Sequence, residues 1–149
     1  MTDLAERRIR CVGAVIFDDA GRLLLVRRAH EPGRGRWSVP GGRVEAGETD
    51  AQAVIREVAE ETGLVVEIVQ LLGQVQRHAP DGGIFDIYDY GCRPAGGTLR
   101  PGDDADDARW CDAHTLATLP IVTGLVEALI SWHCLPAAPS ARPGDIYMS

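Results

Sequence analysis

The chain has 149 residues, a length that fits one domain and leaves little room for a second. Hydrophobic residues make up 45% and charged residues 25%, a mixture typical of a globular protein with a packed core. The formal net charge of -7 argues against broad nucleic-acid binding and against a polybasic membrane contact, so neither partner is expected.

The first ten residues are polar and lack the apolar stretch of a secretory signal. No later apolar run approaches the length that spans a bilayer. The sequence therefore predicts a cytoplasmic protein. The four cysteines include no C-x-x-C pair and are expected to be reduced and mostly buried.

Two apolar runs near the amino terminus predict β-strands. Residues 9–17 are rich in β-branched and apolar side chains, and residues 18–21 supply turn chemistry before the second run at residues 23–26. This pattern predicts a β-hairpin. Residues 28–36 then form a basic loop that contains glycine and proline.

A helix is predicted after a short extended piece at residues 37–39 and a glycine-rich turn at residues 40–42. Thr49 or Asp50 can cap its amino end, and Gly63 can adopt the left-handed conformation that ends it after Thr62. On a helical wheel the residues expected to face the core fall within one arc. They are Ala51, Val54, Ile55, Val58 and Thr62.

Residues 64–76 and 84–91 predict two further strands, which a turn-forming cluster at residues 78–83 joins into a second hairpin. The Gly-, Pro- and Asp-rich residues 93–107 predict a loop.

A short strand at residues 108–111 and an apolar-periodic helix at residues 121–134 follow. Residues 135–149 contain three prolines and little to bury, so they predict a tail that is mobile or docked on a partner subunit. The whole pattern predicts one α/β domain over residues 1–134 with an α/β/α layer arrangement.

Three glutamates of the predicted helix, Glu57, Glu60 and Glu61, stand at i, i+3 and i+4 in an arc beside the apolar one. Like charges at this spacing repel by about 0.2–0.5 kcal/mol per pair. Acids in the last turn also oppose the helix dipole by about 0.3–1 kcal/mol. Because Arg56 alone cannot neutralise three carboxylates, a hard divalent cation with oxygen ligands is the natural partner. On the glutamates alone, a solvated acidic helix face explains the pattern equally well.

The segment from Gly42 to Leu64 satisfies every fixed position of the pattern G-x5-E-x7-R-E-U-x-E-E-x-G-U, where U is a bulky apolar residue. The fixed positions are Gly42, Glu48, Arg56, Glu57, Val58, Glu60, Glu61, Gly63 and Leu64. This segment resembles the Nudix box. A looser likeness spans about residues 9–134 and includes the R-W-S-V-P-G-G segment at residues 36–42.

The resemblance implies the fold of Nudix hydrolases, an α/β/α sandwich around a mixed β-sheet. It also implies hydrolysis of a nucleoside diphosphate linked to another moiety. In this family Glu57 and Glu61 would bind Mg²⁺ or Mn²⁺, Glu60 would contact the metal directly or through water, and the carbonyl of Gly41 would be a further ligand. Bound cations would neutralise the diphosphate and lower the pKa of a coordinated water.

Other positions of the box have structural roles by resemblance. Arg56 would pair with acids, Glu48 among them, and so fix the loop against the helix. Gly42 would permit the tight loop and a close approach of the backbone to the ligand. For Gly63, a helix cap is a sufficient explanation.

The general base is open, because the family places it within the box or on a later loop. Glu60 and Glu57 are candidates within the box. The later loop offers a run of aspartates, for which a solvated acidic surface is the alternative explanation. These are Asp103, Asp104, Asp106 and Asp107.

Residues before the box are candidates for substrate contacts. Arg28 and Arg36, like the neighbouring Arg27 and Arg34, could hold phosphate oxygens through forked hydrogen bonds, with a solvated surface charge as the alternative. Trp37 could stack on a nucleobase or pack in the core.

The choice of substrate depends on residues outside the box. Pro80 stands sixteen residues after Leu64, where ADP-ribose pyrophosphatases of the family often carry a proline, so ADP-ribose or a related nucleotide sugar is favoured. One alternative is a nucleoside triphosphate pyrophosphohydrolase that clears oxidised nucleotides such as 8-oxo-dGTP. Another is a non-catalytic module that senses a nucleotide. The sequence does not indicate the oligomeric state, although homodimers are common in the family.

Overall fold

The computed structural model describes residues 7–102 and 105–139. Ten helices and strands follow one another in this part of the chain. In order they are β1 (Arg8–Ile16), β2 (Leu23–Arg28), β3 (Trp37–Ser38), β4 (Gly41–Arg43), α1 (Asp50–Thr62), β5 (Leu64–His78), β6 (Ile84–Gly97), β7 (Ala105–Cys111), α2 (Ala113–Thr118) and α3 (Leu125–Ser131).

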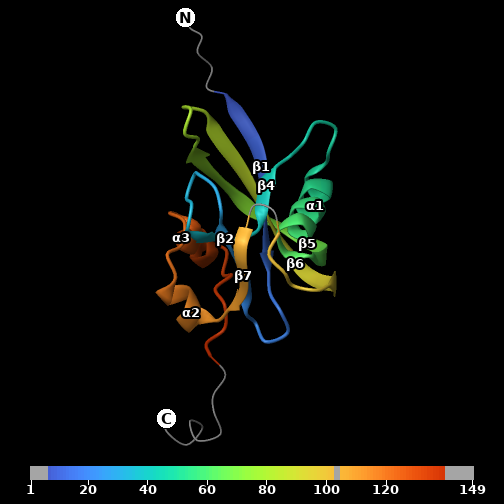
Figure 1. Ribbon diagram of the computed structural model, residues 1–149, viewed down its shortest axis with the longest axis vertical. Coiled ribbons are helices and arrows are strands. Elements are labelled where there is room, and N and C mark those ends of the chain that lie inside the picture. The colour runs from blue at the N-terminus through green and yellow to red at the C-terminus, as the bar shows by residue number, and fades with distance from the viewer. Residues whose placement is uncertain (1–6, 103–104, 140–149) are drawn as a thin grey trace, which may run out of the picture.

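The strands form two sheets between helices (Figure 1). One is four-stranded in the order β4-β1-β6-β5, with β1 parallel to β6 and the other pairs antiparallel. The other is antiparallel and three-stranded, in the order β3-β2-β7. Helix α1 covers one side, and α2 and α3 lie on the other. The predicted α/β/α sandwich with a mixed sheet is therefore confirmed.

The predicted hairpin of the first two strands is wrong. The turn exists, since the side chain of Asp18 accepts hydrogen bonds from the N–H groups of Ala20 and Arg22. Beyond one isolated bridge between Phe17 and Leu23, however, β1 and β2 separate into different sheets. The reason is that β4 and β6 occupy both edges of β1, so that no edge remains for β2. The second predicted hairpin, β5 with β6, is confirmed.

Two expectations for the carboxyl-terminal half are also corrected. The predicted loop at residues 93–107 is shorter, because β6 continues to Gly97 and β7 already begins at Ala105. The predicted helix at residues 121–134 is reduced to α3, because Ile121 forms a strand-like bridge with Trp37 instead of helical hydrogen bonds. The short helix α2 was not predicted. It begins after Asp112, whose side chain accepts the N–H of Thr115 at 2.8 Å.

Two apolar cores meet at β1. Val12, Ala14 and Ile16 pack against α1 in the first core, whereas Val15 belongs to the second core, which lies between the two sheets and α3. This alternation follows the two-residue period of a strand. Strand β1 is therefore in contact with both sides of the molecule.

Helix α1 begins and ends as predicted. Thr49 and Gln52 form a capping box at its amino end, and Gly63 ends it with φ of 76°. Its amino end is also tied to the sheet, because Asp50 accepts two hydrogen bonds of 2.8 Å from Arg10 and one of 2.6 Å from the hydroxyl of Tyr90. The three helices of the described residues contain 13, 6 and 7 residues, and none of them could span a membrane.

The predicted buried face of α1 is confirmed for Val54, Val58 and Thr62 and wrong for Ala51 and Ile55. Ile55 is 43% exposed, and Ala51 is exposed as well. The helix is rotated so that its buried residues are Ala53, Val54, Val58, Glu61 and Thr62. An acidic residue predicted to lie beside the buried face, Glu61, is thus part of it.

The part of the predicted tail that the structure describes is attached to the domain. Ala137 donates its N–H to the carbonyl of Gly21 and accepts the N–H of Ala113. Residues 140–149 lie outside the described residues. Of the four cysteines, Cys11, Cys92 and Cys111 are buried, and all four are free thiols.

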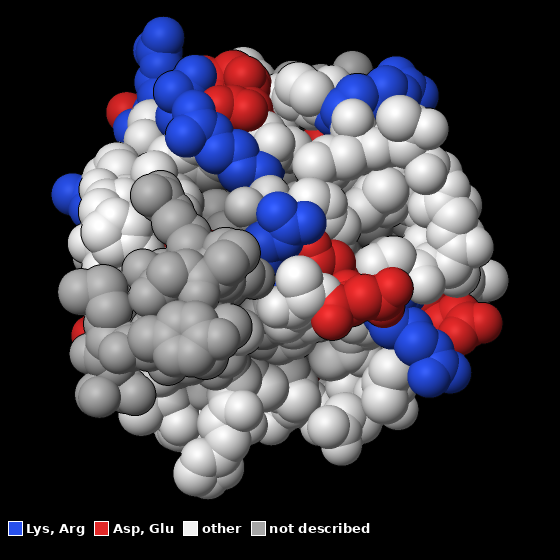
Figure 2. Space-filling view, turned by 90° about the horizontal axis from the view of Figure 1, so that it is seen from below, with Lys and Arg blue, Asp and Glu red and all other residues white. Residues whose placement is uncertain are grey.

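Charged groups are mixed on the face of the molecule shown in Figure 2. Arginine and acidic side chains lie side by side there, and most of the described surface between them is uncharged. Several exposed arginines of the described chain form ion pairs, for example Arg27 with Asp106 and Arg93 with Glu67.

Candidate active site

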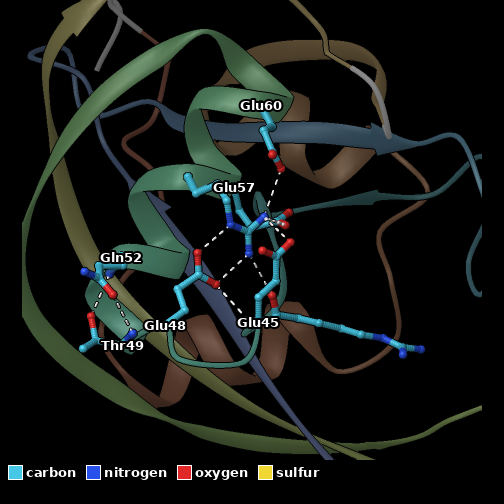
Figure 3. Close-up of polar contacts among 8 residues, drawn as sticks. Glu45, Glu48, Thr49, Gln52, Glu57 and Glu60 are labelled. Carbon is cyan, nitrogen blue, oxygen red and sulfur yellow. Dashed lines mark hydrogen bonds and ion pairs between the residues drawn. The ribbon is translucent and has the colours of Figure 1, made fainter.

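Arg56 bonds to several acids of α1 and of the loop before it. Figure 3 labels these acids, Glu48, Glu57 and Glu60. Its guanidinium donates two hydrogen bonds to the carboxylate of Glu48, from Nε to Oε2 at 2.6 Å and from Nη2 to Oε1 at 2.9 Å. Its Nη1 donates to Glu57 at 2.6 Å and to Glu60 at 3.0 Å. A further bond from Nη2 to the carbonyl of Arg43, at 3.0 Å, fixes the end of β4 to the helix. The predicted pairing of Arg56 with acids is present.

Glu48 holds the loop that leads into α1. Besides the two bonds from Arg56, its carboxylate accepts the N–H of Glu45 at 2.9 Å. These bonds, those from Arg56 first, lower the pKa of Glu48 to about 2. The carboxylate is therefore ionised at neutral pH, and its charge is committed to Arg56.

Glu57 and Glu61 form a close pair of acids, of which Glu61 is buried. Glu61 is 6% exposed, and its Oε1 accepts the N–H of Gly41 at 3.3 Å. Its carboxyl group lies within hydrogen-bond reach of the carboxyl group of Glu57. Burial raises the pKa of Glu57 above its ordinary value, although the bond from Arg56 acts in the opposite direction.

The backbone of β4 passes closely beside this pair because its first two residues are glycines. A Cβ on Gly42 would lie 2.5 Å from Oε2 of Glu57, so any other residue would displace the carboxylate. A Cβ on Gly41 would collide with the carbonyl oxygen of Val12 on β1. The glycines therefore allow the buried carboxylates and the strand to approach each other.

The donor atoms here fit a hard divalent cation. Glu57, Glu61 and the carbonyl of Gly41 offer oxygen atoms, which Mg²⁺ and Mn²⁺ prefer. Two carboxyl groups so close together, of which that of Glu61 is buried, favour a positive charge or a proton between them. Glu60, whose side chain is 49% exposed, is directed to Arg56. Among the described residues, no three acidic, His or Cys side chains are arranged as a metal-binding group.

The aspartates predicted on a loop are placed differently. Asp106 and Asp107 lie on β7, where Asp106 pairs with Arg27 at 2.5 Å. Asp107 accepts the N–H of Ala108 at 2.8 Å and a bond from Arg109 at 3.1 Å. Asp103 and Asp104 lie outside the described residues.

The two arginines predicted to hold phosphate bond to the backbone of the described chain. Arg28 donates to the carbonyl of Pro32 at 2.6 Å, and Arg36 donates to the carbonyl of Ile121 at 3.3 Å. Trp37 is 3% exposed and packs in the second core. The guanidinium groups of Arg27 and Arg109 lie 5.8 Å and 5.1 Å from the centre of its ring. A base could stack on Trp37 only if these side chains moved.

Pro80 is exposed in the turn between β5 and β6. The neighbouring Asp81 forms an ion pair with Arg7, and Ile84 is the strand partner of Arg8 at the beginning of β1. The structure thus places Pro80 at the end of the hairpin opposite to Leu64, the residue that follows α1 and its acids.

One buried acid was not predicted as a site residue. Asp89 is 3% exposed on β6, and burial raises its pKa to about 6, against the opposing effect of Arg77. The available signal was an acid within the apolar and aromatic run of residues 84–91. Because this run also contains Asp86, alternation alone did not show which of the two acids is buried.

The fold and the acids gathered around Arg56 define a pyrophosphohydrolase, an enzyme that acts on phosphorus-containing anhydrides. The chain belongs to the Nudix family, because residues 7–130 match the NUDIX domain. Nudix hydrolases in general use divalent metal ions.

Relatives agree with this assignment. An ADP-ribose pyrophosphatase of Methanocaldococcus jannaschii is 38% identical over 123 residues, which cover 78% of this chain and 72% of that protein. The 8-oxo-dGDP phosphatase NUDT18 of Mus musculus is 39% identical over 93 residues, which cover 62% of this chain but 28% of that protein. The crystal structure of a MutT NUDIX hydrolase from Burkholderia pseudomallei has a TM-score of 0.75 and 30% identity, over 84% of this chain and 98% of that one. The names of the two curated relatives indicate two different substrates.

Proposed function

We propose that this chain hydrolyses the diphosphate of ADP-ribose or of a related nucleotide sugar, with Mg²⁺ or Mn²⁺ as the metal ion. The observation that carries the proposal is the close pair of Glu57 and the buried Glu61 against the backbone of Gly41. The likeness to the archaeal ADP-ribose pyrophosphatase, of which the chain covers 72%, supports the choice of substrate.

The residues of the site have different proposed roles. Glu57, Glu61 and the carbonyl of Gly41 hold the cation, and Glu60 joins them directly or through water. When bound, the cation neutralises the diphosphate and lowers the pKa of a coordinated water. Arg56 and Glu48 position the loop and the helix so that the ligands stay together.

The reaction adds water to one phosphorus and breaks the bridging P–O bond, so that ADP-ribose yields AMP and ribose 5-phosphate. A general base accepts the proton of the attacking water. Glu60 is our first candidate, because its carboxylate is half-exposed and lies on the same helix face as the ligands. Glu57, Asp104 and Asp107 are the other candidates. If Asn variants at residues 103, 104, 106 and 107 all keep full activity across pH, the base is not among these aspartates.

Four residues are proposed to contact the substrate: Arg28, Arg36, Trp37 and Pro80. The two arginines would do so through the guanidinium N–H groups that do not bond to the carbonyls of Pro32 and Ile121. Substitution of each residue in turn, with KM measured for ADP-ribose, tests these contacts. An unchanged KM rejects the residue concerned.

A second candidate function is the removal of oxidised nucleotides, which the likeness to the mouse 8-oxo-dGDP phosphatase favours. A non-catalytic nucleotide sensor is the third, and the complete set of acids around Arg56 speaks against it. The deciding experiment incubates the purified chain and Mg²⁺ with ADP-ribose, dGTP, 8-oxo-dGTP and 8-oxo-dGDP, and identifies the products. AMP with ribose 5-phosphate supports our proposal. Hydrolysis of only the oxidised nucleotides supports the second function, and no hydrolysis supports the third.

A further inference from the structure

Asp89 is a buried acid that the proposed reaction does not use. It lies in the middle of β6 and is 3% exposed. Among residues 7–102 and 105–139, no group donates a hydrogen bond to its carboxylate or pairs with it, and its electrostatic interaction is with Arg77. A buried carboxylate without a hydrogen-bond donor destabilises a protein. Such a residue is therefore a candidate for a functional role.

Both strand partners of Asp89 are glycines. Gly13 of β1 and Gly73 of β5 stand beside it in the sheet. A Cβ on Gly13 would collide with Oδ1 of Asp89 and lie 3.3 Å from the side chain of Val39. Glycine within a strand weakens it and often marks a close approach of a ligand or of other atoms. Here the glycine makes the room that the carboxylate occupies.

The other glycine makes room for an aromatic ring. A Cβ on Gly73 would lie 2.5 Å from the indole nitrogen of Trp132, which follows α3 and is partly exposed. Gly13 faces Val39, and α3 and Val39 both pack in the second core. The carboxylate of Asp89 and the ring of Trp132 therefore lie on the same side of the sheet.

Arg77 supplies a positive group to the same place. Its guanidinium donates to the carbonyl of Thr123, and burial lowers its pKa. Asp89 and Arg28 both act on it electrostatically, yet Arg77 and Asp89 are not in ion-pair contact. One side of the sheet thus carries a hydrogen-bond acceptor (Asp89), a guanidinium with several donors (Arg77) and an aromatic ring (Trp132).

The cluster of Asp89, Arg77 and Trp132 lies on the face of the sheet opposite to α1, and β1 separates its strand from the strand that carries Gly41. Gly13 pairs with Asp89 on one side and with Gly41 on the other. The backbones of Asp89 and Gly41 are therefore two strand spacings, about 10 Å, apart.

We propose that Asp89 determines base specificity by accepting a hydrogen bond from an N–H group of the substrate's nucleobase. Arg77 donates to the neighbouring acceptor of the same ring, since N–H groups and acceptors alternate along the edge of a base. A base reaches Asp89 when Arg77 or Trp132, both partly exposed, turns aside. This inference rests on the proposed function only in that the ligand is a nucleotide.

The test measures binding without catalysis. Titration calorimetry in a metal chelator compares AMP, GMP, CMP and UMP on the wild-type chain and on Asp89→Asn. We expect the variant to lose roughly tenfold or more in affinity for the preferred nucleotide and to change the order of preference. Asp86→Asn is the matched control, because Asp86 lies on the same strand but accepts bonds from Arg8 and Gln76. It should leave the order unchanged.

Equal affinity ratios in Asp89→Asn and wild type overturn the inference, whatever the hydrolysis assays show. A changed order in a chain that hydrolyses no diphosphate keeps the inference and rejects the proposed function. If Asp89→Asn does not fold, Arg77→Lys must change the same ratios, because lysine keeps the charge but lacks the fork of donors. Unchanged ratios in that variant also overturn the inference.

Discussion

Arg56 and Glu48 face each other through two parallel hydrogen bonds, Nε to Oε2 at 2.6 Å and Nη2 to Oε1 at 2.9 Å. This forked geometry is specific to arginine, because a lysine ammonium is a point charge. Since the same guanidinium also bonds Glu57 and the carbonyl of Arg43, it sets the position of β4 relative to α1.

Arg56→Lys should therefore weaken metal binding while keeping the charge. We expect the apparent affinity for Mn²⁺ to fall roughly 10- to 100-fold, as for other groups that orient metal ligands. Turnover at saturating metal should fall much less. Glu45→Gln is the control, because Glu45 lies 3.7 Å from Arg56 and its side chain is 68% exposed. Unchanged Mn²⁺ affinity in Arg56→Lys would show that the ligands need no support from the guanidinium.

Glu57→Gln and Glu61→Gln should each reduce turnover roughly 100-fold or more and leave the fold intact. Glutamine keeps the shape of the side chain but removes the charge that holds a cation. Steady-state hydrolysis at saturating Mg²⁺ and thermal unfolding in a chelator measure the two effects. Glu67→Gln, a change at an exposed ion pair with Arg93, should leave turnover unchanged. Wild-type turnover of either active-site variant would falsify the metal assignment.

Gly42→Ala should damage the same site from the side of the strand. The new methyl group would lie 2.5 Å from Oε2 of Glu57, so the carboxylate must move. We expect weaker Mn²⁺ binding and a loss of about 1–3 kcal/mol in the free energy of unfolding. Gly91→Ala is the matched control, because its Cβ would lie 3.5 Å from the nearest atom of Leu72, an ordinary contact. Equal Mn²⁺ affinity in both variants would mean that Gly42 has no role in positioning Glu57.

The ends of α1 and the identity of its acids could be predicted, since capping residues and the spacing of the box are local properties. The rotation of α1 could not. A helical wheel places apolar residues such as Ile55 in the core, whereas in the structure Glu61 is buried there instead. Glu61 accepts the N–H of Gly41 and lies beside the carboxyl group of Glu57. The burial of an acid can be predicted only when the residues that contact it are known.

Strand pairing likewise depends on distant residues. The turn at Asp18 has the residues of a hairpin, but β4 and β6 take both edges of β1. Ile121 fits a helix by its periodicity, but its bridge to Trp37 prevents one. In both cases tertiary contacts override a correct local signal.

Asp89 makes the stability of the chain depend on pH in a way opposite to most acids. Its pKa rises from 3.8 in the unfolded chain to about 6 in the fold, chiefly through burial. Between these values the folded state binds more protons than the unfolded state, so the free energy of unfolding falls as pH rises through this window. The loss is complete above about pH 6 and amounts to about 3 kcal/mol.

Asp89→Asn removes this dependence, because asparagine does not ionise. We expect the variant to be more stable than the wild type at pH 7.5, by up to about 3 kcal/mol, with the difference closing as pH falls toward 4. Urea unfolding of both proteins at pH 4.5, 5.5 and 7.5 measures it, and the comparison cancels the acids whose pKa is lowered, such as Glu48. A variant that is less stable than wild type at pH 7.5 would show instead that the charge of Asp89 supports the fold through Arg77. In that case the acid is retained for stability, and its burial no longer indicates a role in ligand binding.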